Sequence, residues 1–252
     1  MIDLHSHILP GIDDGARTMD DALALARHSV RVGVSAMVCT PHIHIGTFDN
    51  DYSSIKSTFD YFLAACKAAD IPLMLSFAAE VRICPEVVDL AKENSLPFIG
   101  QFKNKDALLL ELPHSHIPAG SDTLIKWLLN NGIFPIIPHP ERNREIQADY
   151  KKLNWLKNIG CAFQITAGSL TGTFKSKARQ LAWYMLENDM VAYVASDLHN
   201  IHKRPNEMKE AYELISQRFG VDRGNALFYK VPKLISQNLN WENTSQFKLE
   251  SS

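Results

Sequence analysis

Short apolar runs, often rich in β-branched residues, alternate along the chain with longer stretches of helical spacing. In DDALALARHSVRVG, YSSIKSTFDYFLAACKAAD and KARQLAWYMLEND, apolar residues recur three and four positions apart, which predicts amphipathic helices. Glycines at positions 33, 132 and 160 supply turn signals where such stretches end. The apolar runs predict seven strands, at residues 2–5, 36–40, 73–79, 107–112, 134–138, 162–166 and 191–196.

This repetition of strand and helix predicts parallel βαβ units and an α/β fold. Seven strands favour a distorted, TIM-like (β/α)7 barrel, and a doubly wound open sheet is the alternative. Residues 223–240 are expected to form one or two closing helices, and the tail at 242–252 is expected to be frayed. Because the chain has no linker, repeat or low-complexity segment, residues 1–252 are expected to form a single domain.

Composition limits the possible classes of protein. A hydrophobic content of 46% is enough for a full core, and a formal net charge of −2 gives no indication of a nucleic-acid partner. No apolar run approaches the roughly 20 residues of a membrane span, so no membrane insertion is expected. The four cysteines are scattered without a C-x-x-C pair, which favours reduced thiols and a cytoplasmic location.

Potential metal ligands follow six of the seven predicted strands, at the ends where parallel barrels carry their active sites. One such residue alone would more often be a core or capping residue. Six together predict a shared polar centre, for which divalent metal ions are the simplest charge compensation. The candidate ligands are His5, His7, Asp14, His42, Glu80, Glu111, His139, Asp197 and His199.

The ligand types indicate which ions would bind. Imidazole and carboxylate ligands without cysteine suit manganese, iron or zinc, and nine ligands are enough for two or three ions. His5 and His7 lie two residues apart at the end of the first predicted strand, so both side chains are expected to project from one face. Asp13 and Asp14 are both possible ligands, and Asp14 is preferred because it precedes Gly15. Gly15 is expected to permit a turn that most residues cannot adopt.

Two arginines point to phosphate chemistry. Arg142 follows His139 by three residues and Arg204 follows His199 by five, and guanidinium groups beside a metal cluster can bind a phosphate bidentately. A cysteine phosphatase would need an arginine six positions after a cysteine, and none of the four cysteines has one. Phosphate-binding glycine loops and the serine-nucleophile motif are also absent from the sequence.

The motifs DLHSH…DDG, TPH, AAE, HPERN and SDLHN…RP resemble the PHP (polymerase and histidinol phosphatase) superfamily from residue 2 to about residue 206. They are most similar to the bacterial manganese-dependent protein-tyrosine phosphatases of capsule and exopolysaccharide gene clusters. This resemblance implies a (β/α)7 barrel with a trinuclear centre, in which Arg142 and Arg204 bind the phosphoryl group. The implied ligand sets are His5, His7, Glu80 and Asp197 for one ion, Glu80, Glu111 and His139 for a second, and Asp14, His42 and His199 for a third.

The resemblance also implies a substrate, the phosphotyrosine tail of a membrane-associated bacterial tyrosine kinase that controls polysaccharide synthesis. Apolar residues close to the candidate ligands could contact a tyrosine ring, and loop histidines are candidate general acids. The alternatives are a phosphatase of a small metabolite, such as histidinol phosphate, and a non-catalytic metal-binding PHP module. The apolar residues that could contact the tyrosine ring are Ile43, Ile45, Phe48 and Pro113. The candidate general acids are His44, His116 and His202.

Overall fold

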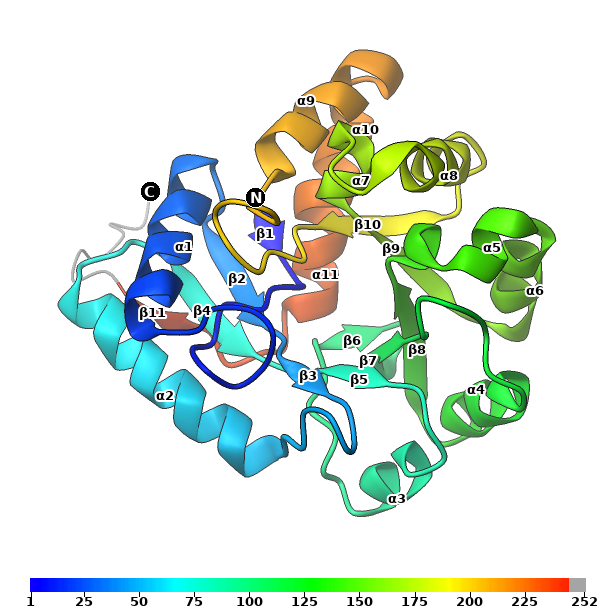
Figure 1. The fold of residues 1–252 in the computed structure, drawn as a ribbon, viewed down its shortest axis with the longest axis horizontal. Helices are drawn as coiled ribbons and strands as arrows, with labels where there is room; N and C mark the ends of the chain where they lie inside the picture. Colours follow the sequence, from blue (N-terminus) through cyan, green and yellow to red (C-terminus); the bar gives the residue numbers. More distant parts are fainter. Residues whose placement is uncertain (245–252) are drawn as a thin grey trace.

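The computed structural model describes residues 1–244, and its strands surround a common interior as predicted (Figure 1). Neighbouring strands run parallel, except that the short β6 and β11 pair antiparallel with β7 and β4. One sheet has the order β1 (Ile2–Asp3), β2 (Ala36–Cys39), β4 (Met74–Phe77), β11 (Glu242–Asn243). The other has the order β10 (Val191–Ala195), β9 (Ala162–Thr166), β8 (Ile133–Pro138), β7 (Lys105–Glu111), β5 (Glu80–Arg82), β3 (His42–Ile43), with β6 (Gln101–Phe102) beside β7.

Backbone hydrogen bonds join the first and last parallel strands at the end where the candidate ligands lie. The amide of Asp197 donates to the carbonyl of His5 at 2.8 Å, and the amide of His7 donates to the carbonyl of Leu198 at 3.0 Å. These bonds continue β1 and β10 past their ends and close the sheet on itself, as a barrel requires. The TIM-like barrel is therefore confirmed over the open sheet.

One of the predicted strands is interrupted by a bend. The prediction of one strand over residues 73–79 is wrong in its end, because β4 stops at Phe77 and Glu80 begins a separate strand, β5. Hydrogen bonds continue across the bend, from the amide of Ala78 to Cys39 at 2.9 Å and from that of Glu80 to Pro41 at 3.0 Å. The barrel wall thus passes from one sheet to the other without losing its pairing.

The helices lie outside the strands, with α1 and α2 on one side and α4, α5 and α6 on the other (Figure 1). A capping box between Thr18 and Asp21 begins α1, and Gly160 in the left-handed conformation ends α6. The helices are α1 (Met19–Arg31), α2 (Tyr52–Ala68), α3 (Val87–Lys92), α4 (Ser121–Asn130), α5 (Arg144–Ala148), α6 (Lys151–Ile159), α7 (Ala167–Thr171), α8 (Lys175–Glu187), α9 (Met208–Phe219), α10 (Val221–Asn225) and α11 (Val231–Ser236), with a 3-10 turn η1 (Pro140–Arg142) and a π-helical turn η2 (Ala226–Lys230).

The apolar core has two parts. The larger part lies between strands and helices, while the smaller includes Leu4, Leu109, Ile136 and Tyr193, all fully buried. Leu109 lies two residues before Glu111 on the same face of β7, so this smaller cluster fills the barrel below the candidate ligands. It forms a rigid apolar support for the polar centre.

The C-terminal segment confirms one prediction and corrects another. Residues 221–236 form α10, η2 and α11, as the expectation of closing helices requires. The expectation of a frayed tail from residue 242 is wrong for its first residues, because β11 pairs with β4 and buried Thr244 accepts a hydrogen bond from the Leu73 amide at 2.9 Å. Residues 245–252 of the predicted tail lie outside the described residues. No helix within residues 1–244 combines the length and apolar character needed to cross a membrane.

Candidate metal centre

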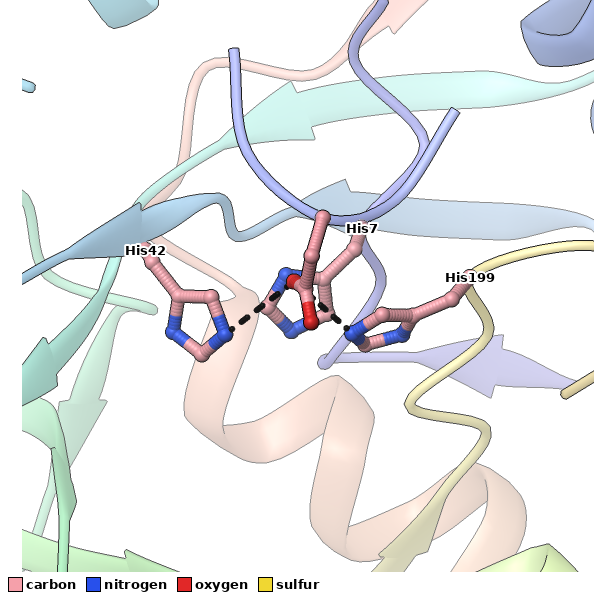
Figure 2. Close-up of side chains that lie close together, drawn as sticks. His7, His42 and His199 are labelled. Carbon is pink, nitrogen blue, oxygen red and sulfur yellow. Dashed lines mark ion pairs between the residues drawn. The ribbon is translucent and has the colours of Figure 1, made fainter. Parts of the chain in front are cut away.

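The nine predicted ligands converge at the carboxyl ends of the strands. All of them are buried except Asp14, and their imidazole nitrogens and carboxylate oxygens form overlapping groups within 4.8 Å. Figure 2 shows the rings of His7, His42 and His199 close together. The groups are His7, Asp14, His42 and His199; His5, His7 and Glu80; His5, His139 and Asp197; and His42, Glu80 and Glu111.

Glu80 lies at the centre of the cluster. Its Oε1 accepts a hydrogen bond from His139 Nε2 at 2.7 Å. Its Oε2 lies 3.0 Å from His42 Nδ1, 3.3 Å from His7 Nε2 and 3.4 Å from His5 Nε2. One carboxylate surrounded by four imidazoles from three strand ends can bridge two cations, which is the role expected for Glu80 in a multinuclear centre.

Further residues orient the histidines through their second ring nitrogens. Gln164 Oε1 lies 2.9 Å from His5 Nδ1, and Asp13 Oδ2 lies 2.7 Å from His7 Nδ1. These contacts fix each ring so that Nε2 faces the centre, as in most protein metal sites. Gln164 comes from β9, whose sequence offers no ligand, so this strand contributes to orientation.

The structure separates the roles of the two neighbouring aspartates. Besides His7, the carboxylate of Asp13 accepts bonds from the Gly15 amide at 2.9 Å and the His42 amide at 3.2 Å. Asp14 Oδ1 instead lies between two rings, 3.4 Å from His42 Nε2 and 3.3 Å from His199 Nε2. This geometry favours Asp14 as the ligand and Asp13 as the residue that orients His7.

The backbone near the ligands is constrained. A Cβ on Gly15 would lie 1.9 Å from the carbonyl oxygen of His7, so this glycine is required for close approach of the chain and not for a positive φ. His139 and Asp197 adopt the left-handed region, with φ of 36° and 49°. Such conformations in residues other than glycine cost energy and concentrate at functional sites, where surrounding structure holds them.

Several buried polar atoms of the cluster have no hydrogen bond among the described residues. They are Oε2 of Glu80 and Glu111, Oδ1 of Asp197, Nδ1 of His42 and Nε2 of His199. Leaving such atoms unpaired costs about 1–3 kcal/mol each. All five are ligand-type atoms that face the centre of the cluster, so the residues present fit bound divalent cations.

Without a bound cation, the charges within the cluster favour protonation of two of its histidines, His7 and His42. Burial alone lowers the pKa of a histidine, but the charge of Asp13 raises that of His7 to about 9. Against the same burial, the charge of Glu80 raises the pKa of His42 to about 11. Burial instead lowers the pKa of His139 to about 3. Binding of cations would therefore displace protons from part of the cluster.

The two predicted arginines reach the cluster. Arg142 and Arg204 both donate to Oδ2 of Asp197, the latter at 2.7 Å, while Oδ1 lies 3.6 Å from His5 Nε2 and 3.4 Å from His7 Nε2. Burial alone would raise the pKa of Asp197, but Arg204 and His5 hold it well below its usual range. One oxygen of Asp197 thus faces the candidate metal ligands and the other faces the arginines.

A cavity of about 220 Å³ opens onto this cluster, and it contains residues that the sequence analysis did not select. Arg82 Nε lies 3.0 Å from Glu111 Oε2 in an ion pair, and His114 Nε2 lies 3.3 Å from Arg142. Arg82 could have been found, since it follows Glu80 by two residues in one strand and therefore shares its face. His114 follows the strand that ends at Glu111, which is a weaker signal.

Some of the loop residues predicted to contact the substrate lie at the cavity, and others do not. His44 and Phe48 line the cavity, and the Phe48 ring stacks on His42 with centroids 5.4 Å apart. Ile43 is buried in the core, which supports packing over substrate contact. His202 lines a separate cavity that adjoins Asp14 and His199, and exposed His116 bonds to its neighbour Ser115 and lines neither cavity. Of the three predicted loop histidines, His44 is therefore the one that lines the same cavity as Glu80, Glu111 and His139.

Together, the fold and the cluster define an α/β barrel of the metal-dependent hydrolase type, with a histidine- and carboxylate-rich centre at the carboxyl ends of its strands. Residues 1–237 match the model of the family described as "Capsular polysaccharide synthesis, CpsB/CapC". This chain belongs to that family. The PHP resemblance of the sequence is consistent with this membership.

Relatives support the same assignment. The tyrosine-protein phosphatase YwqE of Bacillus subtilis is 36% identical over 87% of this chain and 85% of its own. The putative tyrosine-protein phosphatase CapC of Staphylococcus aureus is 32% identical over 84% and 82%. A crystal structure from work on YwqE and Streptococcus pneumoniae CpsB, described as unique metal-dependent tyrosine phosphatases, superposes with a TM-score of 0.87 at 32% identity, covering 96% of this chain and 97% of that one.

Proposed function

We propose that this protein is a metal-dependent protein-tyrosine phosphatase. The observation that carries this proposal is the position of two arginines on the carboxylate of Asp197, at the edge of a cluster of ligand-type side chains. Paired guanidinium groups beside divalent cations suit a phosphoryl group, whose charge is spread over three oxygens. Two relatives that match this chain over most of their length are named as a tyrosine-protein phosphatase and a putative tyrosine-protein phosphatase, and these names support the same activity.

The proposed cofactor is manganese, in two or three ions per chain, with iron or zinc as the other metals that suit these ligands. The groups of ligand atoms support the predicted ligand assignment in part. Asp14, His42 and His199, the predicted third set, lie in one group together with His7, and Glu80 lies in two groups, in keeping with its predicted place in two ligand sets. When bound, such ions lower the pKa of coordinated water and provide a nucleophile near neutral pH.

The chain's own residues bind and orient the phosphoryl group in this proposal. Arg142 and Arg204 hold its equatorial oxygens, where negative charge develops in the transition state. Arg82 lines the same cavity and adds positive charge beside Glu111. Phe48, stacked on His42 at the cavity wall, offers an apolar surface for the ring of a phosphotyrosine. Departure of a phenolate, with its moderate basicity, makes little demand on a general acid.

The cysteines have no place in this chemistry. Cys39, Cys66 and Cys161 are buried, and burial raises the pKa of the Cys66 and Cys161 thiols to about 12. A thiol with so high a pKa is not a nucleophile at neutral pH. The partly buried Cys84 lines a groove between α3 and α4, away from the ligand cluster.

We further propose the phosphotyrosine tail of a membrane-associated tyrosine kinase as the substrate, met by this protein in the cytoplasm, with residues 1–252 acting as one domain. The family description, which concerns capsular polysaccharide synthesis, supports this choice. A cavity of about 220 Å³ that opens at the barrel mouth is accessible to a side chain presented by a flexible tail.

The test is a substrate panel with the manganese-loaded protein. Phosphotyrosine peptides should be hydrolysed about tenfold faster or more, by kcat/KM, than phosphoserine peptides or histidinol phosphate. Part of this preference arises because a phenolate leaves more readily than an alkoxide. A small aryl phosphate measured in parallel isolates that part. Preferential hydrolysis of histidinol phosphate would refute the tyrosine-phosphatase assignment, and retained activity after strong chelation would refute the role of the metal.

A further inference from the structure

One aromatic side chain lies against both candidate phosphate-binding arginines. The centroid of the Phe174 ring is 4.3 Å from Cζ of Arg142 and 5.6 Å from Cζ of Arg204. Both distances are within the roughly 6 Å over which a cation is attracted to an aromatic face. The three residues come from η1, the segment after β10 and the connection between α7 and α8, so only the tertiary structure brings them together.

The backbone around this ring is held in an uncommon conformation. Gly172 has a φ of 109° and Lys175 has a φ of 69°, so two left-handed residues enclose Phe174. Glycine adopts such angles readily, but lysine does so at a cost in energy. A strained lysine next to this ring indicates that the surrounding contacts determine where the ring lies.

Those contacts are specific. The hydroxyl of Thr173 donates to the Glu207 carboxylate at 2.8 and 2.9 Å, and the hydroxyl of Thr171 donates to it at 2.7 Å. On the other side, the ring packs directly on the backbone of Gly168, where an added Cβ would lie 3.0 Å from Phe174 Cε2. The ring is thus fixed by the residue before it and by a glycine beneath it.

A second link connects the two segments that carry Arg142 and Phe174. Glu141, the neighbour of Arg142 in η1, is fully buried and accepts bonds from the Thr166 amide at 3.0 Å and the Ser169 hydroxyl at 2.7 Å. Thr166 directly precedes α7, and Ser169 lies in its first turn. Glu141 therefore caps the start of this helix from a separate segment of the chain. The arginine-bearing turn and the segment that leads to Phe174 therefore form one hydrogen-bonded unit.

We propose that Phe174 is a positioning residue that holds the guanidinium groups of Arg142 and Arg204 for phosphoryl binding. A ring over the face of a guanidinium leaves its N–H donors free, because all five lie in the guanidinium plane. The ring also limits the conformations of two long side chains before substrate arrives, which lowers the cost of ordering them on binding. This inference rests on the proposed phosphatase function.

The test compares Phe174→Leu with Phe219→Leu in the manganese-loaded protein. Phe219 is the matched control, because its ring lies 5.6 Å from Cζ of Arg218, a residue outside the cluster and its cavity. Phe174→Leu should lower kcat/KM for a small aryl phosphate about tenfold, the scale of one desolvated cation–π contact, and weaken binding of inorganic phosphate in calorimetry by a similar factor. Metal content should equal that of the wild type, and Phe174→Tyr should recover most of the loss.

A mutant cycle separates positioning from a general structural effect. In the Arg142→Ala, Arg204→Ala background, Phe174→Leu should change phosphate affinity by less than about twofold, since its effect passes through the arginines. The same tenfold factor in both backgrounds, or wild-type values in Phe174→Leu itself, would overturn the inference. If the wild type hydrolyses no phosphotyrosine but Phe174→Leu still weakens phosphate binding, the proposed function fails and the positioning role stands.

Discussion

The roles of Asp13 and Asp14 can be separated by replacing each with asparagine. Asparagine has nearly the shape of aspartate but only one acceptor oxygen. Asp13 uses both oxygens, one for the Gly15 amide at 2.9 Å and the other for His7 Nδ1 at 2.7 Å. In Asp13→Asn, the amide NH2 must therefore face one of these two N–H donors, and the orientation of the His7 ring is weakened.

The expected magnitudes differ between the two variants. Loss of a residue that orients a ligand usually lowers metal affinity about 10- to 100-fold, or about 1.4–2.8 kcal/mol. Asp13→Asn should therefore need more manganese but bind the same number of ions at saturation. Asp14→Asn removes a carboxylate oxygen that lies 3.3 Å from His199 Nε2 and 3.4 Å from His42 Nε2, so it should bind one ion fewer even with excess metal.

The assay is elemental analysis of each variant after equilibration with a series of manganese concentrations, with phosphatase activity measured on the same samples. Thermal unfolding of the metal-free proteins shows whether either variant is damaged in its fold. If Asp13→Asn bound fewer ions at saturation while Asp14→Asn kept the full number, the assignment would be reversed. Equal losses of stoichiometry in both would show that the hydrogen bonds of Asp13 do not exclude it from metal binding.

Three further predictions follow from the same geometry. The pKa values of His7 and His42 are raised to about 9 and 11, so both rings carry a proton at neutral pH in the metal-free protein. Because manganese must displace these protons, its affinity should rise from pH 6 to pH 8. An affinity that does not change with pH in a chelator competition would contradict this. Arg142→Ala or Arg204→Ala should lower kcat/KM roughly 10²-fold. Metal content should be unchanged, because the remaining arginine still pairs with the Asp197 carboxylate. Loss of metal would show that the arginines have a structural role instead. Phe48→Ala should reduce turnover of a phosphotyrosine peptide more than that of a small aryl phosphate, and equal reductions would exclude Phe48 from peptide recognition.

The sequence by itself determined the elements and the chemical content of the site. Short apolar runs located the seven wall strands within a few residues, because these strands are buried on both faces, and helical spacing located helices between them. Ligand-type residues could be found because a parallel barrel presents every strand end at one mouth. For this reason His5, Glu111 and His139, distant in sequence, could be assigned to one centre before any coordinates.

The tertiary structure alone decided how those residues share their contacts. No periodicity indicates that the wall bends before Glu80, that Gln164 orients His5, or that Asp13 and Asp14 face different partners. These outcomes depend on hydrogen bonds between segments far apart in the chain, and local patterns carry no information about such pairs. The contact of Phe174 with two arginines is of the same kind, since it arises where three separate connections meet above the barrel.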